Sequence, residues 1–266
     1  MYEFNYQRAS SVADAAAKVG AGEDARLLAG GQTLIAAMKL RLANPTDLVD
    51  LGGIAGLRGI KADKDSITVG AMATHAEVAA SKDVRQHIPA LADLAESIGD
   101  PMVRNMGTIG GSIANNDPAA DYPAGLVGLG ATVKTNQREV SADDFFTGMF
   151  MTALEPTEII ESISFPKPGR AAYMKFANPA SRYAIVGVFV AQTGNAVRVA
   201  VTGAGASVFR VPEMEQALTA SFAPEAIGDI SVASDGLNAD LHASADYRAH
   251  LVSVMAKRAV ERALAG

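Results

Sequence analysis

The chain has 266 residues and a formal net charge of −6, and 49% of its residues are hydrophobic. This length and composition are typical of a globular protein with two small domains around separate cores, and the acidic balance argues against nucleic acid as a partner. Because the sequence contains no cysteine, disulfides, thiolate catalysis and cysteine-bound iron–sulfur clusters are excluded from this chain.

Short strands and helices alternate in the first part of the chain. The apolar pattern predicts helices over residues 11–19, 32–42, 74–80, 88–98 and 117–129, and strands over 27–29, 47–50, 57–61, 66–70, 131–135 and 159–165. This alternation predicts an α/β region of two lobes, with the lobe boundary near residues 55–62. Pro166 and Pro168 oppose regular structure, so we expect the first domain to end at residue 168.

Residues 169–266 have a different pattern. Strands are expected over 171–178, 183–192 and 196–203, with Gly194 in a hairpin turn between the second and third strands. Helices are expected over 211–218 and 246–265, with Asp246 as a helix cap. The sequence thus predicts an α+β C-terminal domain, in which helices cover a three-stranded antiparallel sheet.

Two turns with adjacent glycines are the main candidates for a binding site. Gly30 and Gly31 follow a short apolar strand, and Gly110 and Gly111 come before a predicted helix. Glycine has no Cβ atom, so backbone N–H groups in such turns can approach an anion closely. Two turns of this kind, if they meet in space, suit a ligand with two adjacent phosphates.

Two carboxylates follow the second turn. Asp117 is expected to cap a helix whose first residue is Pro118, and Asp121 stands four residues further on. Because residues four apart share one helix face, acid–base catalysis by the two carboxylates is an alternative role. Beside a phosphate-binding turn, helix capping and hydroxyl binding are the favoured roles.

Other nucleotide and catalytic motifs are incomplete. Gly203 and Gly205 begin a dinucleotide fingerprint, but Val208 stands at the third glycine position. Neither glycine pair continues into a P-loop, and no serine stands in a nucleophile elbow. No two of the four histidines have metal-ligand spacing, so we expect no metal site.

Several segments of the sequence act as motifs only when taken together. They are AGGQT at residues 29–33, MKLR at 38–41, RNMGTIGGS at 104–112 and DPAAD at 117–121. As a set they resemble the FAD-binding medium subunit of molybdenum hydroxylases, a family that includes carbon monoxide dehydrogenase and xanthine dehydrogenase. The resemblance spans nearly the whole chain. It implies a FAD-binding domain of the vanillyl-alcohol-oxidase-like (PCMH) type in residues 1–168, a carbon monoxide dehydrogenase flavoprotein domain in 169–266, and non-covalent FAD.

The resemblance also assigns residues to the cofactor. The first FAD loop would be Leu28, Ala29, Gly30, Gly31, Gln32, Thr33, Leu34 and Ile35, and the second Thr108, Ile109, Gly110, Gly111 and Ser112, with Asp117 beside it. Ile98 and Ile160 match apolar positions near the adenine or the flavin, for which core packing is the alternative.

Three polar residues complete this implied site. Asp121 would accept hydrogen bonds from ribose or ribityl hydroxyls, because a carboxylate repels diphosphate. Lys175 would bring a cation to the N1–C2=O edge of the flavin, and Tyr183 would cover one flavin face. The alternatives are a solvated strand lysine and a half-buried sheet tyrosine. Fewer basic residues precede Tyr183 than in carbon monoxide dehydrogenases, which argues against carbon monoxide as the substrate.

The implied function is electron relay, with no catalytic acid or base in this chain. A large partner would hold molybdenum-pterin and oxidise the substrate, a small partner would hold two [2Fe–2S] clusters, and FAD would pass electrons to a quinone, NAD or oxygen. The resemblance implies a dimer of heterotrimers. We also expect no transmembrane segment and no secretory signal, hence a cytoplasmic location, either free or at the inner membrane face.

Two alternative functions belong to other classes. One is a free-standing flavin oxidase of the vanillyl-alcohol-oxidase-like fold, which would turn over its own substrate without partners. The other is a binding or assembly protein that kept the fold and lost FAD.

Overall fold

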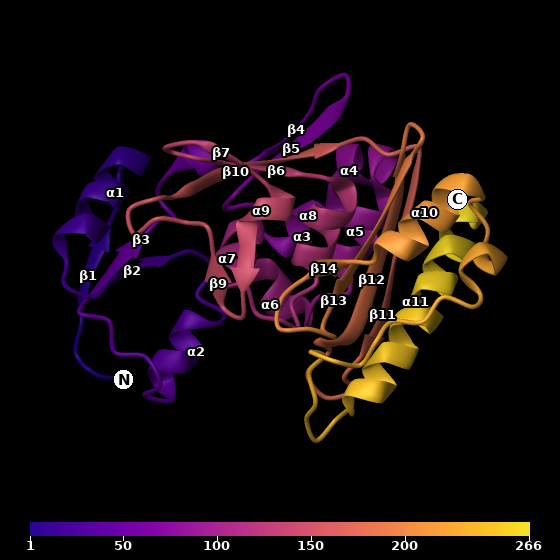
Figure 1. The fold of residues 1–266 in the computed structure, drawn as a ribbon. Helices are drawn as coiled ribbons and strands as arrows, with labels where there is room; N and C mark the ends of the chain where they lie inside the picture. The colour runs from indigo at the N-terminus through magenta and orange to yellow at the C-terminus, as the bar shows by residue number, and fades with distance from the viewer.

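The computed structural model describes residues 1–266, and three structural units follow one another along the chain (Figure 1). The N-terminal unit, at the left of Figure 1, is a parallel sheet in the order β1-β3-β2 with α1 beside it. Its elements are β1 (Asn5–Arg8), α1 (Val12–Ala21), β2 (Ala25–Leu28), α2 (Leu34–Lys39), β3 (Asp47–Asp50) and the 3₁₀ turn η1 (Ala55–Leu57).

The middle unit is a five-stranded antiparallel sheet packed with helices, in the order β4-β5-β10-β6-β7. Its strands are β4 (Ile60–Ala62), β5 (Ser66–Gly70), β6 (Thr132–Thr135), β7 (Glu139–Ser141) and β10 (Ile160–Pro166), and β8 (Phe146–Gly148) pairs with β9 (Met151–Thr152) as a separate hairpin. Its helices are α3 (His75–Ala80), α4 (Lys82–His87), α5 (Pro89–Glu96), α6 (Pro101–Met106), α7 (Ile109–Asn115), α8 (Tyr122–Leu129) and α9 (Ala142–Phe145).

The C-terminal unit is an antiparallel sheet in the order β11-β12-β13-β14, with the long helix α11 along its outer face (Figure 1). Its elements are β11 (Arg170–Ala177), β12 (Ala184–Thr193), β13 (Ala196–Thr202), β14 (Phe209–Arg210), α10 (Pro212–Ala220), the 3₁₀ turn η2 (Pro224–Ile227) and α11 (Ala245–Ala265). Strand β12 is buried on both faces, which explains its nearly continuous apolar sequence.

The inner face of this last sheet shares a core with the middle unit. Leu91 of α5 and Phe165 of β10 belong to the same buried cluster as Tyr173 and Phe189 of the C-terminal sheet. At Gly128 of α8, a Cβ atom would lie 2.7 Å from the Phe189 ring, so the glycine allows the close approach of helix and sheet. The expectation of separate cores is therefore wrong for these two units.

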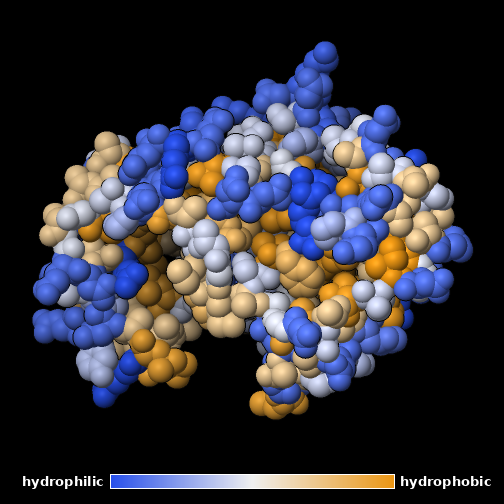
Figure 2. Space-filling model, viewed as in Figure 1, coloured by the Kyte–Doolittle hydropathy of each residue, from blue (hydrophilic) through white to orange (hydrophobic).

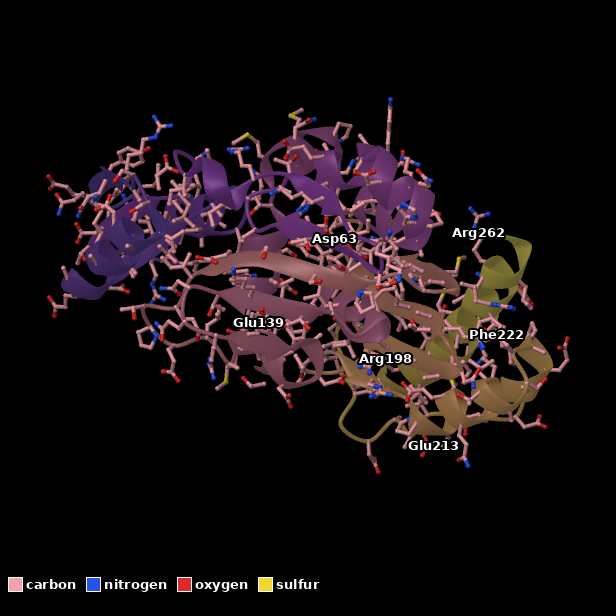
Figure 3. The ribbon with its side chains drawn as sticks, turned by 90° about the horizontal axis from the view of Figure 1, so that it is seen from above. Asp63, Glu139, Arg198, Glu213, Phe222 and Arg262 are labelled. Carbon is pink, nitrogen blue, oxygen red and sulfur yellow. The ribbon has the colours of Figure 1, made fainter.

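Polar contacts cross the same boundary. Seen from above, Arg198 of β13 lies where the C-terminal sheet meets the middle unit (Figure 3). Its Nε donates to the Val127 carbonyl of α8 at 2.7 Å, and its guanidinium pairs with Asp143 of α9. Arg198 thus holds the sheet to the helices through a hydrogen bond and an ion pair, in addition to the apolar packing.

The predicted α+β class is confirmed, and the largest local error is the helix expected over 117–129. The chain instead forms α7, capped by Thr108, and α8, with a turn between them. Carbonyls in this turn accept hydrogen bonds from the C-terminal sheet: Gly203 N to Pro118 O at 2.8 Å and Thr202 Oγ1 to Ala120 O at 2.6 Å. These bonds hold residues 117–120 in a turn against the sheet, where the Asp117 carboxylate accepts from Ala119 N at 2.8 Å and does not cap a helix.

Other differences are smaller. Helix α2 is shorter than the predicted 32–42 because Arg41 adopts a left-handed conformation, with φ 60°. The C-terminal sheet has a fourth strand, β14, in place of the expected three. Ser244, and not Asp246, caps α11 by accepting from the Tyr247 N–H. The segment 57–61 is divided between η1 and β4, and no helix of the chain could cross a membrane.

Candidate functional site: a cleft between two glycine turns

A cleft of about 790 Å³ lies beside the N-terminal unit, and all three units line it. Figure 2 shows the hollow between this unit and the rest of the molecule. Its walls come from the segment after β2, the start of α7, the segment 117–121 and the turn 181–183. A volume of this size is in the range of clefts that bind cofactors.

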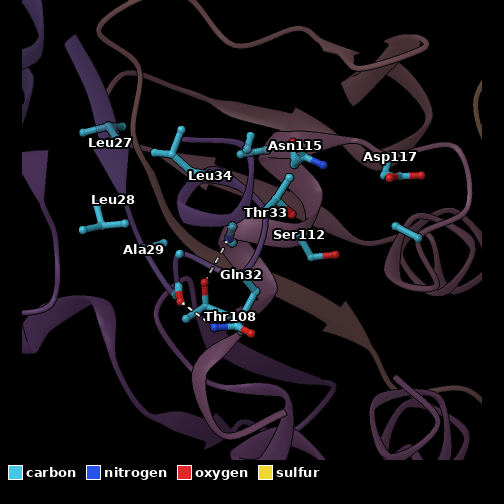
Figure 4. A pocket seen from close by; sticks show the side chains of 18 of the residues that line it. Leu27, Leu28, Ala29, Gln32, Thr33, Leu34, Thr108, Ser112, Asn115 and Asp117 are labelled. Carbon is cyan, nitrogen blue, oxygen red and sulfur yellow. Dashed lines mark hydrogen bonds between the residues drawn. The ribbon is translucent and has the colours of Figure 1, made fainter. Parts of the chain in front are cut away.

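The two glycine turns meet at this cleft. A Cβ atom on Gly30 would lie 2.1 Å from the carbonyl oxygen of Met106, and one on Gly111 would lie 3.4 Å from the Cβ of Ala29. Only glycine at position 30 allows the backbones to approach so closely. In Figure 4 the side chains of Gln32 and Thr33 lie beside those of Thr108 and Ser112.

The first turn offers free donors to this cleft. The backbone N–H groups of residues 30–33 donate to no other group of the protein, while Gly31 has φ 69° and Thr33 makes no side-chain cap. Unpaired N–H groups that converge on a cleft form a binding site for an anion.

The second turn has its N–H groups occupied. Ile109 N donates to Ala73 O at 3.0 Å, Gly110 N to Ala71 O at 2.9 Å, and Gly111 N to Thr108 Oγ1 at 3.1 Å. The glycines lie within the first turn of α7, not before it. Both glycines line the cleft, beside the hydroxyl-bearing side chains of Thr108 and Ser112, and their missing Cβ atoms allow close packing against Ala71 and Ala29.

All but three of the residues that the sequence assigned to the cofactor line the cleft. Ile109 is fully buried in the core, and Ile35 packs beside Gly31. Lys175 is 7% exposed and contacts Asp121 behind the cleft wall. Ile98 and Ile160 both line the cleft, although Ile160 is 6% exposed and also belongs to the core.

Asp121 is the buried carboxylate of the cleft. Its Oδ1 accepts from the Tyr173 hydroxyl at 2.5 Å and from Lys175 Nζ at 2.9 Å. Burial raises the pKa of Asp121, and the charge of Lys175 opposes that rise. Tyr183 is 47% exposed, and burial with the charges of Asp117 and Asp121 raises the pKa of its hydroxyl, so it keeps its proton.

Two buried titratable residues of the cleft wall, His75 and Glu158, are not among those that the sequence assigned to the site. Burial and the charge of Arg104 lower the pKa of His75 to about 4, so this histidine is neutral at pH 7. The sequence placed His75 at the start of the helix predicted over 74–80, and Thr74 and Glu77 form a capping box there, but its burial had no signal in the sequence. A bidentate ion pair with Arg138 lowers the pKa of Glu158 to about 2, which keeps the carboxylate ionised.

Comparison with known proteins agrees with this geometry. Residues 2–168 match the family described as the FAD binding domain in molybdopterin dehydrogenase. The chain belongs to this family. The nicotine 6-hydroxylase medium subunit of Paenarthrobacter nicotinovorans is 35% identical, and the match covers 97% of this chain and 96% of that one. The carbon monoxide dehydrogenase medium chain of Hydrogenophaga pseudoflava is 36% identical, over 98% and 97% respectively.

A solved structure gives the same result. A chain of reconstituted carbon monoxide dehydrogenase from Oligotropha carboxidovorans superposes with a TM-score of 0.91 at 34% identity, over 99% of this chain and 98% of that one. The chain is therefore the FAD-binding medium subunit of a molybdenum-dependent dehydrogenase or hydroxylase, an enzyme with further, large and small, subunits. This membership favours the subunit over the free-standing flavin oxidase.

Proposed function

We propose that this medium subunit relays electrons from [2Fe–2S] clusters of a small partner through FAD to an external acceptor. The observation that carries the cofactor site is the row of free N–H groups at residues 30–33, all of which line the cleft. FAD supplies the redox chemistry when bound. The chain itself binds the cofactor, orients it and leaves an entrance for the acceptor.

The residues of the cleft have distinct proposed roles. Backbone N–H groups of Gly30 and Gly31, with the side chains of Gln32 and Thr33, hold the diphosphate. The second turn forms a wall of the cleft, because Gly110 packs closely against Ala71 and Gly111 lies beside Thr108 and Ala29. Leu28, Ala29, Leu34, Ile98 and Ile160 give apolar contact, Ser112 borders the diphosphate, and Asp117 and Asp121 accept from ribose or ribityl hydroxyls.

The assembly and its surroundings are part of the same proposal. We keep residues 1–168 and 169–266 as the two domains, and the small and large partners as carriers of [2Fe–2S] clusters and molybdenum-pterin. The complex is a dimer of heterotrimers in the cytoplasm, free or at the inner membrane face. The acceptor is a quinone, NAD or oxygen. Family membership supports these statements.

Ser112 provides a test of the cofactor site that does not damage the fold. This residue lines the cleft in the first turns of α7, where an acidic side chain suits the helix. We expect Ser112→Glu to weaken FAD binding by about 100-fold through repulsion of the diphosphate, while Ser112→Gln, of equal size, loses about tenfold or less.

The measurement is FAD content and affinity in the purified protein, with the released flavin identified by mass. Near-ultraviolet circular dichroism checks that both variants fold. Equal affinity in the Glu and Gln variants would mean that no diphosphate lies near Ser112, and a folded wild-type complex without FAD would contradict the proposed function itself.

A further inference from the structure

Asp121 uses only one of its two carboxylate oxygens within the protein. The Tyr173 hydroxyl donates to Oδ1 at 2.5 Å, and the Lys175 ammonium forms an ion pair with the same oxygen at 2.9 Å. No other residue donates a hydrogen bond to Oδ2, and Asp121 lines the cleft. Oδ2 is therefore the oxygen that is left for a ligand, while Oδ1 fixes the orientation of the carboxylate.

Lys175 has no free N–H group for a ligand. Its ammonium contacts Asp121 Oδ1 at 2.9 Å, the Ser97 carbonyl at 3.0 Å and the Arg182 carbonyl at 3.0 Å. An ammonium has three N–H donors, and here it has three partners: two carbonyls that accept hydrogen bonds and the carboxylate of the ion pair. The side chain is 7% exposed and does not line the cleft. It would have to give up a buried partner to reach a flavin.

The three acceptors of Lys175 belong to separate parts of the cleft wall. Ser97 comes directly before Ile98 and Gly99, which line the cleft on one side. Arg182 comes directly before Tyr183, which lines it on another side, and Asp121 lies on the segment after α7. One buried cation therefore holds three separate segments of the wall in place from behind.

The turn that carries Tyr183 is itself under constraint. Arg182 has φ 63°, a conformation that an arginine adopts only when its surroundings hold it there. Asn178 closes the turn by donating its N–H to Tyr183 O and accepting from Arg182 N, both at 2.8 Å. The bond from Lys175 to the Arg182 carbonyl fixes this turn at its strained residue.

We propose that Lys175 is a positioning residue that acts through Asp121 and the Tyr183 turn, rather than a cation that contacts the flavin. Tyr173 is its neutral counterpart on the same carboxylate oxygen. The inference rests on the proposed FAD site. It departs from the sequence-based expectation that Lys175 reaches the N1–C2=O edge, because the lysine has no donor left for that contact.

FAD affinity in a double-mutant cycle tests this coupling. The variants are Lys175→Met, Asp121→Asn and the two together, each in the assembled complex after FAD removal and titration with FAD. We expect each single change to weaken binding about tenfold or more, and the double variant to bind no more weakly than the weaker single variant. Losses that multiply in the double variant would show that Lys175 and Asp121 act separately and would overturn the inference.

The midpoint potential of the bound flavin gives an independent readout. Lys175→Met leaves a negative charge and should lower the potential, while Asp121→Asn leaves a positive charge and should raise it. The double variant removes a neutral pair, so its potential should return to the wild-type value. A lysine in direct contact with the flavin would act more strongly than Asp121, so the potential of the double variant would stay well below the wild-type value, which would contradict the proposal.

Two further variants protect the test against misfolding. Tyr173→Phe removes one hydrogen bond to Oδ1 without changing any charge, so FAD should bind about threefold to tenfold more weakly at an unchanged potential. The partly exposed pair Lys134 and Glu161, 3.5 Å apart, is the matched control, and removal of both charges should change neither the FAD affinity nor the midpoint potential.

If the single Lys175 variant does not fold, Tyr173→Phe and the charge-neutral double variant still test the inference. Wild-type affinity in Tyr173→Phe would overturn it. A wild-type complex that binds no FAD would instead contradict the proposed function.

Discussion

The first and second glycine turns have similar sequences but use their backbones differently. At residues 30–33 the N–H groups are free, and Thr33 makes no cap. At residues 109–111 every N–H group is occupied by Ala71, Ala73 or Thr108. The first turn is therefore built to bind a ligand, and the second is built into the core and contributes a surface.

The comparison shows that a glycine pair has at least two physical uses in one site. Gly31 has a positive φ that exposes successive N–H groups. Gly110 is required by packing, since its missing Cβ would lie 2.7 Å from Ala71. A substitution at Gln32 or Thr33 of the first turn should mainly change FAD binding, whereas one at Gly110 of the second turn should mainly change folding.

The largest expected effect is a loss of folding stability at acid pH, caused by His75. This histidine packs directly against the residue before the second turn, since a Cβ on Gly107 would lie 2.6 Å from its Nε2. The pKa of His75 is about 4 in the folded protein and about 6.5 in an unfolded chain. Between these two values the unfolded chain binds a proton at His75 that the folded protein does not bind. Stability is unaffected above pH 6.5 and falls by about 3 kcal/mol as the pH drops to 4.

Urea unfolding at pH 7 and pH 4 measures this loss. His75→Gln cannot titrate, so it should lose about 3 kcal/mol less than the wild type over this range. His242→Gln, at an exposed position, is the control and should behave like the wild type. An equal loss in the His75 variant would mean that the histidine is not buried beneath the second turn.

A methyl group on the second turn is the next test. Gly110→Ala brings a Cβ within 2.7 Å of both the Cβ and the carbonyl oxygen of Ala71, and should lower the free energy of unfolding by about 2 kcal/mol. Gly56→Ala, where a Cβ would contact nothing within 4 Å, should change it by about 0.5 kcal/mol or less. The measurement is denaturant unfolding, and equal stability of the two variants would contradict the packing role.

The smallest effect separates the two threonines of the turns. Thr108 Oγ1 accepts from Gly111 N, so Thr108→Val should cost about 1 kcal/mol of stability. Thr33 has no such bond, so Thr33→Val should leave stability unchanged and weaken FAD binding. Thermal unfolding with FAD titration measures both, and a destabilised Thr33 variant with normal affinity would reverse the two assignments.

Sequence was sufficient for the fold class and for the residues that meet at the cleft. Strands with clear apolar runs, such as β5 and β13, were predicted within a residue, because their pattern is local. The segment 116–121 was not, because its conformation depends on hydrogen bonds to Thr202 and Gly203, more than 80 residues away. The family resemblance assigned both glycine turns to the cofactor, but it did not show that only the first turn has free N–H groups.

The role of individual polar groups was also beyond sequence. Lys175 reads as a strand lysine, and only the fold shows that three separate segments occupy its ammonium. His75 reads as a helix-start histidine, and only burial makes it neutral. Whether an N–H group is free depends on the packing of the whole chain, so the contrast between the two turns is a property of the fold and not of the local sequence.

Hydrogen exchange of backbone amides with and without bound FAD tests the central claim most directly. Residues 30–33 should exchange rapidly in the FAD-depleted protein and slow at least about tenfold when FAD binds, since their N–H groups have no other partner. Residues 109–112 should exchange slowly in both states, because their N–H groups are already bonded within the protein. Rapid exchange at 109–112 that FAD suppresses, with no change at 30–33, would contradict the account.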